Sequence, residues 1–232
     1  MSASGWSSDN ALHVSEQARG LFGARRHVAS GTQSTLVYDA TKRLVDVAGA
    51  SLLLILSLPV LIFCAALILA ATRQNPLLAQ RRIGWRGQEF TMLKLRTMRS
   101  CESDEAEFAE ANDVFVLKEP IDPRVTSIGR LMRRCSLDEL PQLLNVIAGQ
   151  MSLVGPRPSL PCEVARYPRA WLRRFSVKPG ISGLWQVSGR SDVPPRRRIA
   201  LDRHYVSHRS LALDLAILLR TVVAVLSRRG AW

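Results

Sequence analysis

The longest apolar pattern in the chain is an uncharged run from Val47 to Thr72. Its apolar residues occupy every side of a helix, and its length meets the roughly 20-residue requirement for the hydrocarbon core of a bilayer. Residues 1–40 are rich in Ser, Gly and Ala without a sustained apolar period, which is typical of a flexible tail. The pattern therefore predicts a membrane helix over residues 41–73, followed by a domain over residues 74–232. A buried helix of a soluble protein is the alternative.

The flanks of this run bear on its topology. Pro59 lies near its middle, and its flanks are basic, with Lys42 and Arg43 before it and Arg73, Arg81 and Arg82 after it. Basic residues favour the cytoplasmic side, so both ends favour the same side, and a proline inside a helix bends it. We expect a re-entrant helix hairpin that bends at Pro59 and returns to the cytoplasmic face; a single crossing is the alternative.

Shorter patterns predict the elements that follow. Residues 90–95 favour a short strand after a glycine-containing turn. Apolar residues recur at helical spacing over residues 125–135 and again over 140–147, which predicts two short helices with a break near Ser136. Residues 102–110 are acidic, as in a solvated helical face. The fold class expected is mainly α with a small β element (α+β).

Two further stretches are typical of interfacial amphipathic helices. Residues 168–175 mix Trp with Arg, as a helix at a membrane surface does. Residues 211–226 are apolar but include Asp214 and Arg220, and they are short for a span. We expect the second helix either to lie on the membrane or to close the core.

Charge and cysteine content narrow the classes of partner and compartment. The formal net charge of +13 implies an anionic partner, which could be nucleic acid, a phosphorylated substrate or an acidic membrane face. The cysteines lack C-x-x-C spacing, which argues against a disulfide framework or a zinc site and fits a reducing compartment. These cysteines are Cys64, Cys101, Cys135 and Cys162.

Two adjacent carboxylates, Asp138 and Glu139, stand between arginines that include Arg133 before them and Arg157 after them. Arginine holds a phosphate bidentately, and a carboxylate can attack phosphorus or bind a divalent metal. We expect the pair in the first turn of the second short helix, where free backbone N–H groups favour anions. Chemistry on a phosphate ester is the function this pattern indicates.

A structural alternative applies to these residues. Ser136 and Glu139 also match a capping box, in which each side chain satisfies a backbone donor of the other residue.

Arg190 is a further candidate for phosphate binding. It follows Ser188 and Gly189, and small neighbours would let a phosphate approach the backbone. A plain surface loop explains the Arg190 segment equally well.

A series of short motifs follows one order from residue 42 to near the C-terminus. They are Lys42–Asp46, the apolar segment, Gln80–Gly84, Phe90–Met98, Asp122–Arg124, Ser136–Leu143, Gly149–Pro158, Lys178–Arg190 and Leu201–Tyr205. In content and order they resemble the bacterial sugar transferase family, the monotopic phosphoglycosyl transferases. Among its members the chain is most similar to the small enzymes that start exopolysaccharide repeat units with hexose 1-phosphate. One departure is that Leu58 separates Ser57 from Pro59, whereas the family often has an adjacent Ser-Pro.

The resemblance implies an activity and a site. Hexose 1-phosphate would pass from a UDP-sugar to undecaprenyl phosphate with release of UMP, through a covalent phosphosugar-aspartyl intermediate. Asp138 would be the nucleophile and Glu139 its partner acid, both associated with Mg²⁺. The basic positions that would hold substrate phosphates are Lys94, Arg133, Arg157 and Arg190.

The expected setting is the bacterial inner membrane, with the catalytic domain in the cytoplasm. Galactose and glucose lead as the transferred sugar, and a homo-oligomer or polysaccharide-assembly partners remain open. A non-catalytic scaffold of an export complex is one alternative, against which the intact Asp138–Glu139 pair counts. A membrane-tethered nucleic-acid binder is the other, but no nucleic-acid-binding motif supports it.

Overall fold

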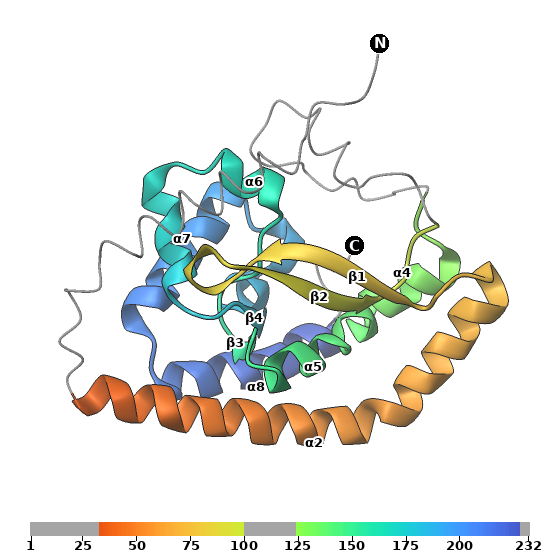
Figure 1. Ribbon diagram of the computed structural model, residues 1–232, viewed down its shortest axis with the longest axis horizontal. Helices are drawn as coiled ribbons and strands as arrows, with labels where there is room; N and C mark the ends of the chain where they lie inside the picture. The colour runs from red at the N-terminus through yellow and green to blue at the C-terminus, as the bar shows by residue number, and fades with distance from the viewer. Residues whose placement is uncertain (1–32, 100–123, 228–232) are drawn as a thin grey trace, which may run out of the picture.

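The computed structural model describes residues 33–99 and 124–227, and within these ranges it is mostly helical with two small sheets (Figure 1). The α-helices are α2 (Gln33–Thr72), α4 (Ser127–Arg134), α5 (Gln142–Ile147), α6 (Pro161–Ala165), α7 (Pro195–His208) and α8 (Leu211–Ser227). The strands are β1 (Leu77–Ile83), β2 (Glu89–Leu95), β3 (Ser152–Val154) and β4 (Gly180–Ser182). The 3₁₀ segments are η1 (Trp85–Gly87), η2 (Leu137–Glu139), η3 (Arg169–Ser176), η4 (Gln186–Ser188) and η5 (Arg190–Asp192). The mainly helical class with a small β element is thereby confirmed.

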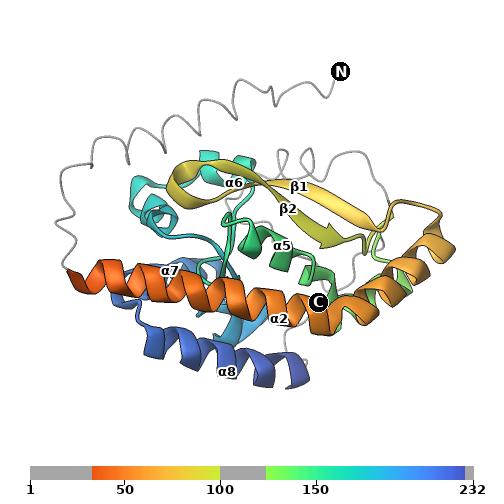
Figure 2. The same ribbon diagram turned by 60° about the horizontal axis from the view of Figure 1, so that its bottom comes forward.

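Helix α2 runs along one edge of the molecule, and its C-terminal part bends towards the start of β1 (Figures 1 and 2). Pro59 lies inside it, where a proline removes a backbone hydrogen bond. Within the described residues it is the one helix long and apolar enough to cross a membrane, and only 11% of its most apolar window is buried. The predicted apolar helix is confirmed. It begins at Gln33, so it includes the last residues of the predicted tail.

The hairpin of β1 and β2 is antiparallel and pairs Lys94 with Leu78. Its position on the domain is fixed by the buried Asn145 of α5, whose side chain accepts from the backbone N–H of Leu93 and donates to the carbonyl of Thr91. The amide thereby pairs with backbone groups on the edge of β2 that have no neighbouring strand to bond to in the described part of the chain. The predicted strand over residues 90–95 is therefore present and held against α5.

Strands β3 and β4 are parallel, with Ser152 opposite Gly180. Their approach is so close that a Cβ at Gly180 would collide with the backbone of Gly155, and one at Gly155 would lie 2.5 Å from the Lys178 carbonyl oxygen. Only glycine allows such an approach. This contact places the Gly-Pro-Arg-Pro turn that contains Arg157 beside the segment that follows Lys178.

The main core joins α2, α5, α7 and α8 around β3. Its most buried members include Met92, Val146, Met151, Tyr205 and Ile217. A smaller cluster packs the second half of α2 against α4. Burial of these side chains is what stabilises the domain, at about 25 cal/mol per Å² of apolar surface.

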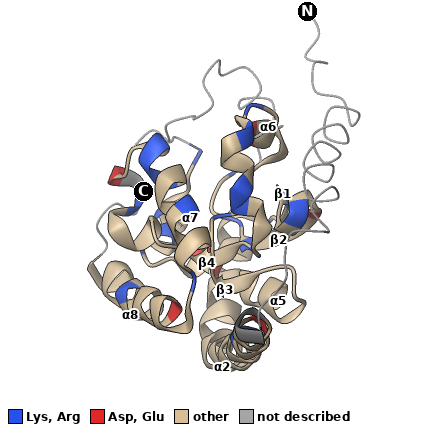
Figure 3. Cartoon of the chain, turned by 90° about the vertical axis from the view of Figure 1, so that its left-hand side faces the viewer, with Lys and Arg blue, Asp and Glu red and all other residues tan. Residues whose placement is uncertain are grey.

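Helix α8 closes the core, which is one of the two roles expected for residues 211–226; its location on a membrane stays a prediction. It lies beside the first part of α2 with a similar direction (Figures 2 and 3), and it buries Asp214 and Ile217. Its other face exposes apolar side chains, namely Leu215, Leu219, Val222, Val223 and Leu226. The helix therefore closes the core and also presents an apolar face.

The interfacial helix expected over residues 168–175 takes a different form. The segment is η3, and it buries Leu172, Arg174 and Phe175 in the domain, because Arg174 makes an ion pair with the buried Asp202 there. Other expectations lie outside the described residues: the tail up to residue 32, the acidic stretch 102–110 and Cys101. Cys64, Cys135 and Cys162 are free thiols.

Candidate functional site

The carboxylate pair lies in a sharp change of chain direction. Helix α4 ends at Arg134, and Ser136 adopts a left-handed conformation with φ of 56°. The 3₁₀ segment η2 follows and contains both Asp138 and Glu139. The predicted break near Ser136 is confirmed. The pair nevertheless lies before α5 rather than in its first turn, because Pro141 precedes the helix and α5 begins only at Gln142.

Glu139 is the point where three separate parts of the chain meet. Its Oε1 lies 3.5 Å from Nζ of Lys94 on β2 and 3.8 Å from Nη1 of Arg157 in the Gly-Pro-Arg-Pro turn. Asp138 is 9% exposed and also interacts electrostatically with Lys94. The structure thus brings Lys94, Arg157 and the carboxylate pair together, although 45 residues separate Lys94 from Glu139 in the sequence.

The capping box is not formed. Ser136 makes no side-chain cap; instead its hydroxyl accepts a hydrogen bond of 2.6 Å from Nη2 of Arg190. Arg190 has a φ of 52° and also donates to the carbonyl of Ala224 in α8. Arg190 therefore supports the turn immediately before Asp138.

Arg133 lies further from the pair. Its Nε donates to the hydroxyl of Thr97 at 2.9 Å, and it forms no ion pair with either carboxylate among the described residues. The geometry places Arg133 on the α4 side of the turn, in the last turn of that helix. Of the predicted basic residues, Lys94 and Arg157 contact the acids directly, whereas Arg133 and Arg190 do not.

The charges at this site are incompletely balanced. Burial lowers the pKa of Lys94, and the neighbouring Arg157 and Arg82 lower it further, while Glu139 and Asp138 act in the opposite direction. Burial also lowers the pKa of Arg82 to about 10, with Arg157 adding to the effect. A cluster in which cations depress each other's pKa favours a bound anion.

Arg82 is a residue of this site that the sequence pattern identified only as a basic flank of the apolar run. It is 7% exposed, its Nη2 donates to Gln80 at 2.7 Å, and its Nε has no partner among the described residues. No carboxylate lies within ion-pair distance of it in that part of the chain. Its place in the Gln80–Gly84 motif was the available signal.

A small pocket opens beside Glu139. Its walls come from β2, η2, α5, the Gly-Pro-Arg-Pro turn, β4 and η4. The lining residues are Met92, Lys94, Glu139, Gln142, Arg157, Pro158, Gly180, Ile181 and Gln186. The pocket therefore joins an acid and two cations to apolar and amide side chains.

The turn that carries Arg157 is supported from below by a buried ion pair. Nη2 of Arg174 donates to the Arg157 carbonyl at 2.8 Å and lies 2.7 Å from Oδ2 of Asp202. Arg174 and Asp202 are 5% and 1% exposed. Burial raises the pKa of Asp202 to about 6, against the opposing pull of Arg174 and Arg157. These two residues were not predicted, because nothing in their spacing links them to residue 157.

The two carboxylates match the way in which Mg²⁺ is commonly bound in phosphate-handling enzymes. The described residues contain no group of three or more His, Cys, Asp or Glu side chains that could hold a metal. Mg²⁺ in phosphate-handling sites is commonly bound by one or two carboxylates, water and the substrate phosphates. Asp138 and Glu139 can supply that carboxylate pair, with the remaining ligands coming from the substrate and water.

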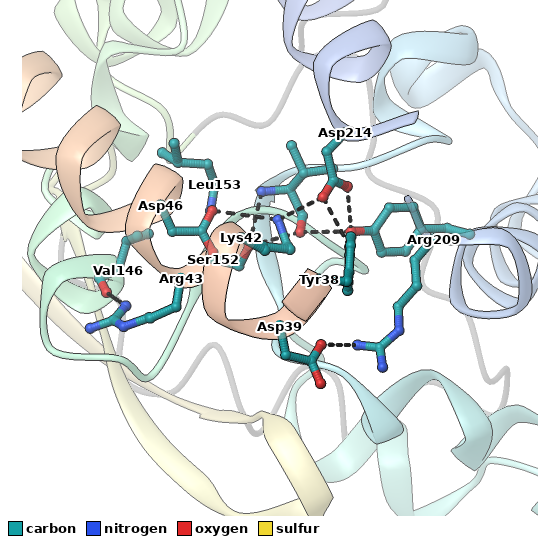
Figure 4. Close-up of polar contacts among 12 residues, drawn as sticks. Tyr38, Asp39, Lys42, Arg43, Asp46, Val146, Ser152, Leu153, Arg209 and Asp214 are labelled. Carbon is teal, nitrogen blue, oxygen red and sulfur yellow. Dashed lines mark hydrogen bonds and ion pairs between the residues drawn. The ribbon is translucent and has the colours of Figure 1, made fainter. Parts of the chain in front are cut away.

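The start of α2 is fastened to the domain by the Lys42–Asp46 motif (Figure 4). Lys42 Nζ lies 3.1 Å from Asp214 and 3.4 Å from Asp46. Arg43 donates to the carbonyls of Val146 and Ile147 at the end of α5, at 2.7 and 2.8 Å. Asp46 accepts from the Leu153 N–H at 3.0 Å.

Asp214 is the centre of a second set of contacts in the same region (Figure 4). It accepts from the hydroxyls of Tyr38 and Tyr205 at 3.0 and 2.7 Å. Arg209 also pairs with Asp39 at 3.1 Å. The basic residues before the apolar run therefore fasten α2 to α5 and α8.

An exposed apolar helix, fastened to a domain whose cationic pocket adjoins a carboxylate pair, defines a class of membrane-associated enzyme that acts on phosphates. Figure 3 shows that most Lys and Arg lie away from the apolar helices α2 and α8. The family profile described as "Bacterial sugar transferase" matches residues 37–228. The chain belongs to this family and is an enzyme of the sugar phosphotransferase class.

Individual relatives agree with this assignment. The exopolysaccharide production protein ExoY of Rhizobium meliloti is 43% identical over 199 residues, which cover 82% of this chain and 88% of that relative. The UDP-galactose-lipid carrier transferase of Erwinia amylovora is 43% identical over 202 residues, but this match covers 82% of the chain and only 41% of the relative. The UDP-glucose:undecaprenyl-phosphate glucose-1-phosphate transferase of Caulobacter vibrioides is 40% identical over 211 residues, covering 87% and 76%.

Proposed function

We propose that this enzyme transfers hexose 1-phosphate from a UDP-sugar to undecaprenyl phosphate and releases UMP, as the first membrane step of exopolysaccharide synthesis. The observation that carries the proposal is the pocket in which Lys94 and Arg157 flank Glu139 directly beside Asp138. The names of the relatives support the two substrates. Galactose and glucose are the leading sugars for the same reason.

The reaction follows from the charges around Asp138. A carboxylate oxygen of Asp138 attacks the β-phosphorus of the UDP-sugar, and the bond from that phosphorus to the bridging oxygen breaks, so UMP leaves with that oxygen. A phosphate oxygen of undecaprenyl phosphate then attacks the phosphosugar on Asp138. The acyl-phosphate bond breaks, which regenerates the carboxylate and gives a lipid diphosphate-linked hexose.

The cations make this attack feasible. A carboxylate and a diphosphate repel each other, and Lys94, Arg157 and Arg82 place positive charge at the site before the substrate arrives. Arg190 and Arg133 supply further positive charge on the other side of η2. Asp138 and Glu139 would hold Mg²⁺, which when bound neutralises charge on the diphosphate.

The topology proposed is a re-entrant helix, with the catalytic domain on the cytoplasmic face. Both ends of α2 are held by one domain: Lys42 and Arg43 bind α8 and α5, while Cys64 and Ile68 pack against Met132 of α4. A helix whose two ends contact the same domain returns most simply to the side from which it entered. Pro59 lies between these two attachments, where a bend is needed.

The test is UMP release by purified full-length enzyme with Mg²⁺, undecaprenyl phosphate and each of a panel of UDP-sugars. We expect continued UMP release and a lipid-linked product with UDP-galactose or UDP-glucose. With undecaprenol in place of its phosphate we expect no lipid-linked product and at most one equivalent of UMP. A non-catalytic scaffold would release no UMP with any of the UDP-sugars. That result would remove the proposed activity.

A further inference from the structure

We propose that Gln142 and Gln186 form the sugar subsite of this pocket, where their amides bind hydroxyl groups of the hexose and set which sugar is accepted. This inference rests on the proposed function. Both residues line the pocket that also contains Glu139 and Arg157. Neither was assigned a role by its sequence pattern, and neither is charged.

Gln142 has a largely buried side chain whose amide is available to a ligand in the pocket. It is the first residue of α5, three positions after Glu139, and it is 3% exposed. Its side chain has no hydrogen bond to any other described residue. Its amide atoms are not among the fully buried polar atoms that lack a partner in the described residues, so the amide keeps contact with the pocket. The amide can therefore hydrogen-bond to a ligand there.

Gln186 brings a second amide to the wall of the same pocket. Its Nε2 donates to the Ile181 carbonyl at 3.0 Å, which fixes the side chain, and its Oε1 is buried with no partner among the described residues. A Cβ at Gly183 would lie 2.9 Å from this oxygen, so the glycine provides the space that Oε1 occupies. The oxygen can accept a hydrogen bond from a ligand hydroxyl.

The position of the amides favours the sugar over the uracil base. Lys94 and Arg157 mark where the transferred phosphate binds, and the hexose is joined to that phosphate by a single oxygen. The base is separated from it by a ribose and a second phosphate. Amides pair well with hydroxyl groups, which both donate and accept. Met92, Pro158 and Ile181 in the same walls supply apolar contacts for the ring carbons.

Binding measurements test this inference separately from turnover. Gln142→Met and Gln186→Met keep the side-chain length but remove the amide, and Gln88→Met changes an exposed glutamine outside the pocket as a matched control. Calorimetry with the full-length enzyme would give Kd values for UDP-glucose, UDP-galactose and UMP. We expect each pocket variant to weaken binding of at least one UDP-hexose by about 3- to 10-fold, the effect of one hydrogen bond. UMP binding should stay unchanged, as should all Kd values of Gln88→Met.

UDP-glucose analogues that each lack one hydroxyl group identify the partner. The analogue that lacks the contacted hydroxyl should bind the wild type more weakly than UDP-glucose does, but should bind the matching Gln→Met variant no more weakly. A thermal unfolding midpoint at or above that of the wild type would show that Gln142→Met remains folded. An equal loss of UMP and UDP-hexose affinity would place the amides at the nucleotide and overturn the inference. Unchanged binding of every ligand by both variants would also overturn it. UMP release in the same preparations reports on the proposed activity independently.

Discussion

At the residue scale, the site combines paired and unpaired charges. Glu139 is shared between Lys94 and Arg157, and Arg174 is paired with Asp202 and donates to the Arg157 carbonyl. Arg82, by contrast, is a buried cation whose one hydrogen-bond partner among the described residues is the amide of Gln80. Buried cations without counter-ions reduce stability, and proteins keep such groups where function needs them. The imbalance is thus best explained by an anionic substrate.

Asp138→Asn tests the nucleophile. The substitution keeps the shape of the side chain but removes the attacking charge, so UMP release should fall by several orders of magnitude. Asp192→Asn, at an exposed aspartate in η5, is the matched control and should remain active. Retention of a tenth of wild-type turnover by Asp138→Asn would show that another group attacks.

Glu139→Gln should also lose most activity, without a large change in unfolding temperature, because no capping box is present.

Arg82→Met separates binding from stability. Removing a buried cation that has no ion-pair partner among the described residues should leave the unfolding temperature equal or higher. The affinity for a UDP-sugar should fall by roughly 10-fold, because one charge-assisted hydrogen bond to the substrate is lost. Calorimetry and thermal unfolding on the same preparation measure both quantities. A large fall in unfolding temperature with unchanged affinity would make Arg82 a structural residue.

At the element scale, the sequence pattern predicted individual elements better than it predicted the long-range contacts between them. The uncharged run, the strand at residues 90–95 and the break at Ser136 each follow from periodicity or turn residues within a short window. The meeting of Lys94 with Arg157 could not be predicted in this way, because it depends on the packing of β2 and of the turn after β3. The pattern of residues 168–175 did not reveal that Arg174 faces the buried Asp202, because that ion pair joins segments far apart in the sequence.

Asp214→Ala tests the attachment of α2. The change leaves Lys42 with only Asp46 as a counter-ion and removes the acceptor of the Tyr38 and Tyr205 hydroxyls. Loss of one partner from a buried ion pair costs about 3–5 kcal/mol. Thermal unfolding of the detergent-solubilised enzyme should therefore show a clear decrease. Asp192→Ala is the control, and an equal midpoint in both variants would show that the contacts do not hold the helix.

At the scale of the whole molecule, one apolar surface and one charged pocket belong to a single unit. Helix α2 exposes apolar side chains along its length, and α8 adds an apolar face beside it. The pocket lies among the cationic elements of the same domain. An enzyme for a lipid phosphate requires this arrangement, because the phosphate stays at the interface while the chain of the lipid stays in the bilayer.

The proposed topology predicts the accessibility of both ends. Single cysteines replacing Leu36, which is 67% exposed, and the exposed Ser207 should both resist a membrane-impermeant thiol reagent in intact spheroplasts of a strain that expresses the otherwise cysteine-free enzyme. Both should react after lysis. Labelling of the residue-36 variant alone in intact cells would demonstrate a spanning helix. Pro59→Leu should shift part of the population towards that form, because an unbroken apolar helix of this length can cross the bilayer.

The most direct test of the central claim is the stoichiometry of UMP release without a lipid acceptor. Wild-type enzyme mixed with its UDP-sugar and Mg²⁺ alone should release up to one equivalent of UMP, and its mass should increase by that of a hexose phosphate, as expected for a covalent intermediate. The added mass should map to the peptide containing Asp138 and disappear when undecaprenyl phosphate is supplied. UMP release that depends strictly on undecaprenyl phosphate, with no mass gain, would contradict the covalent mechanism and indicate direct transfer.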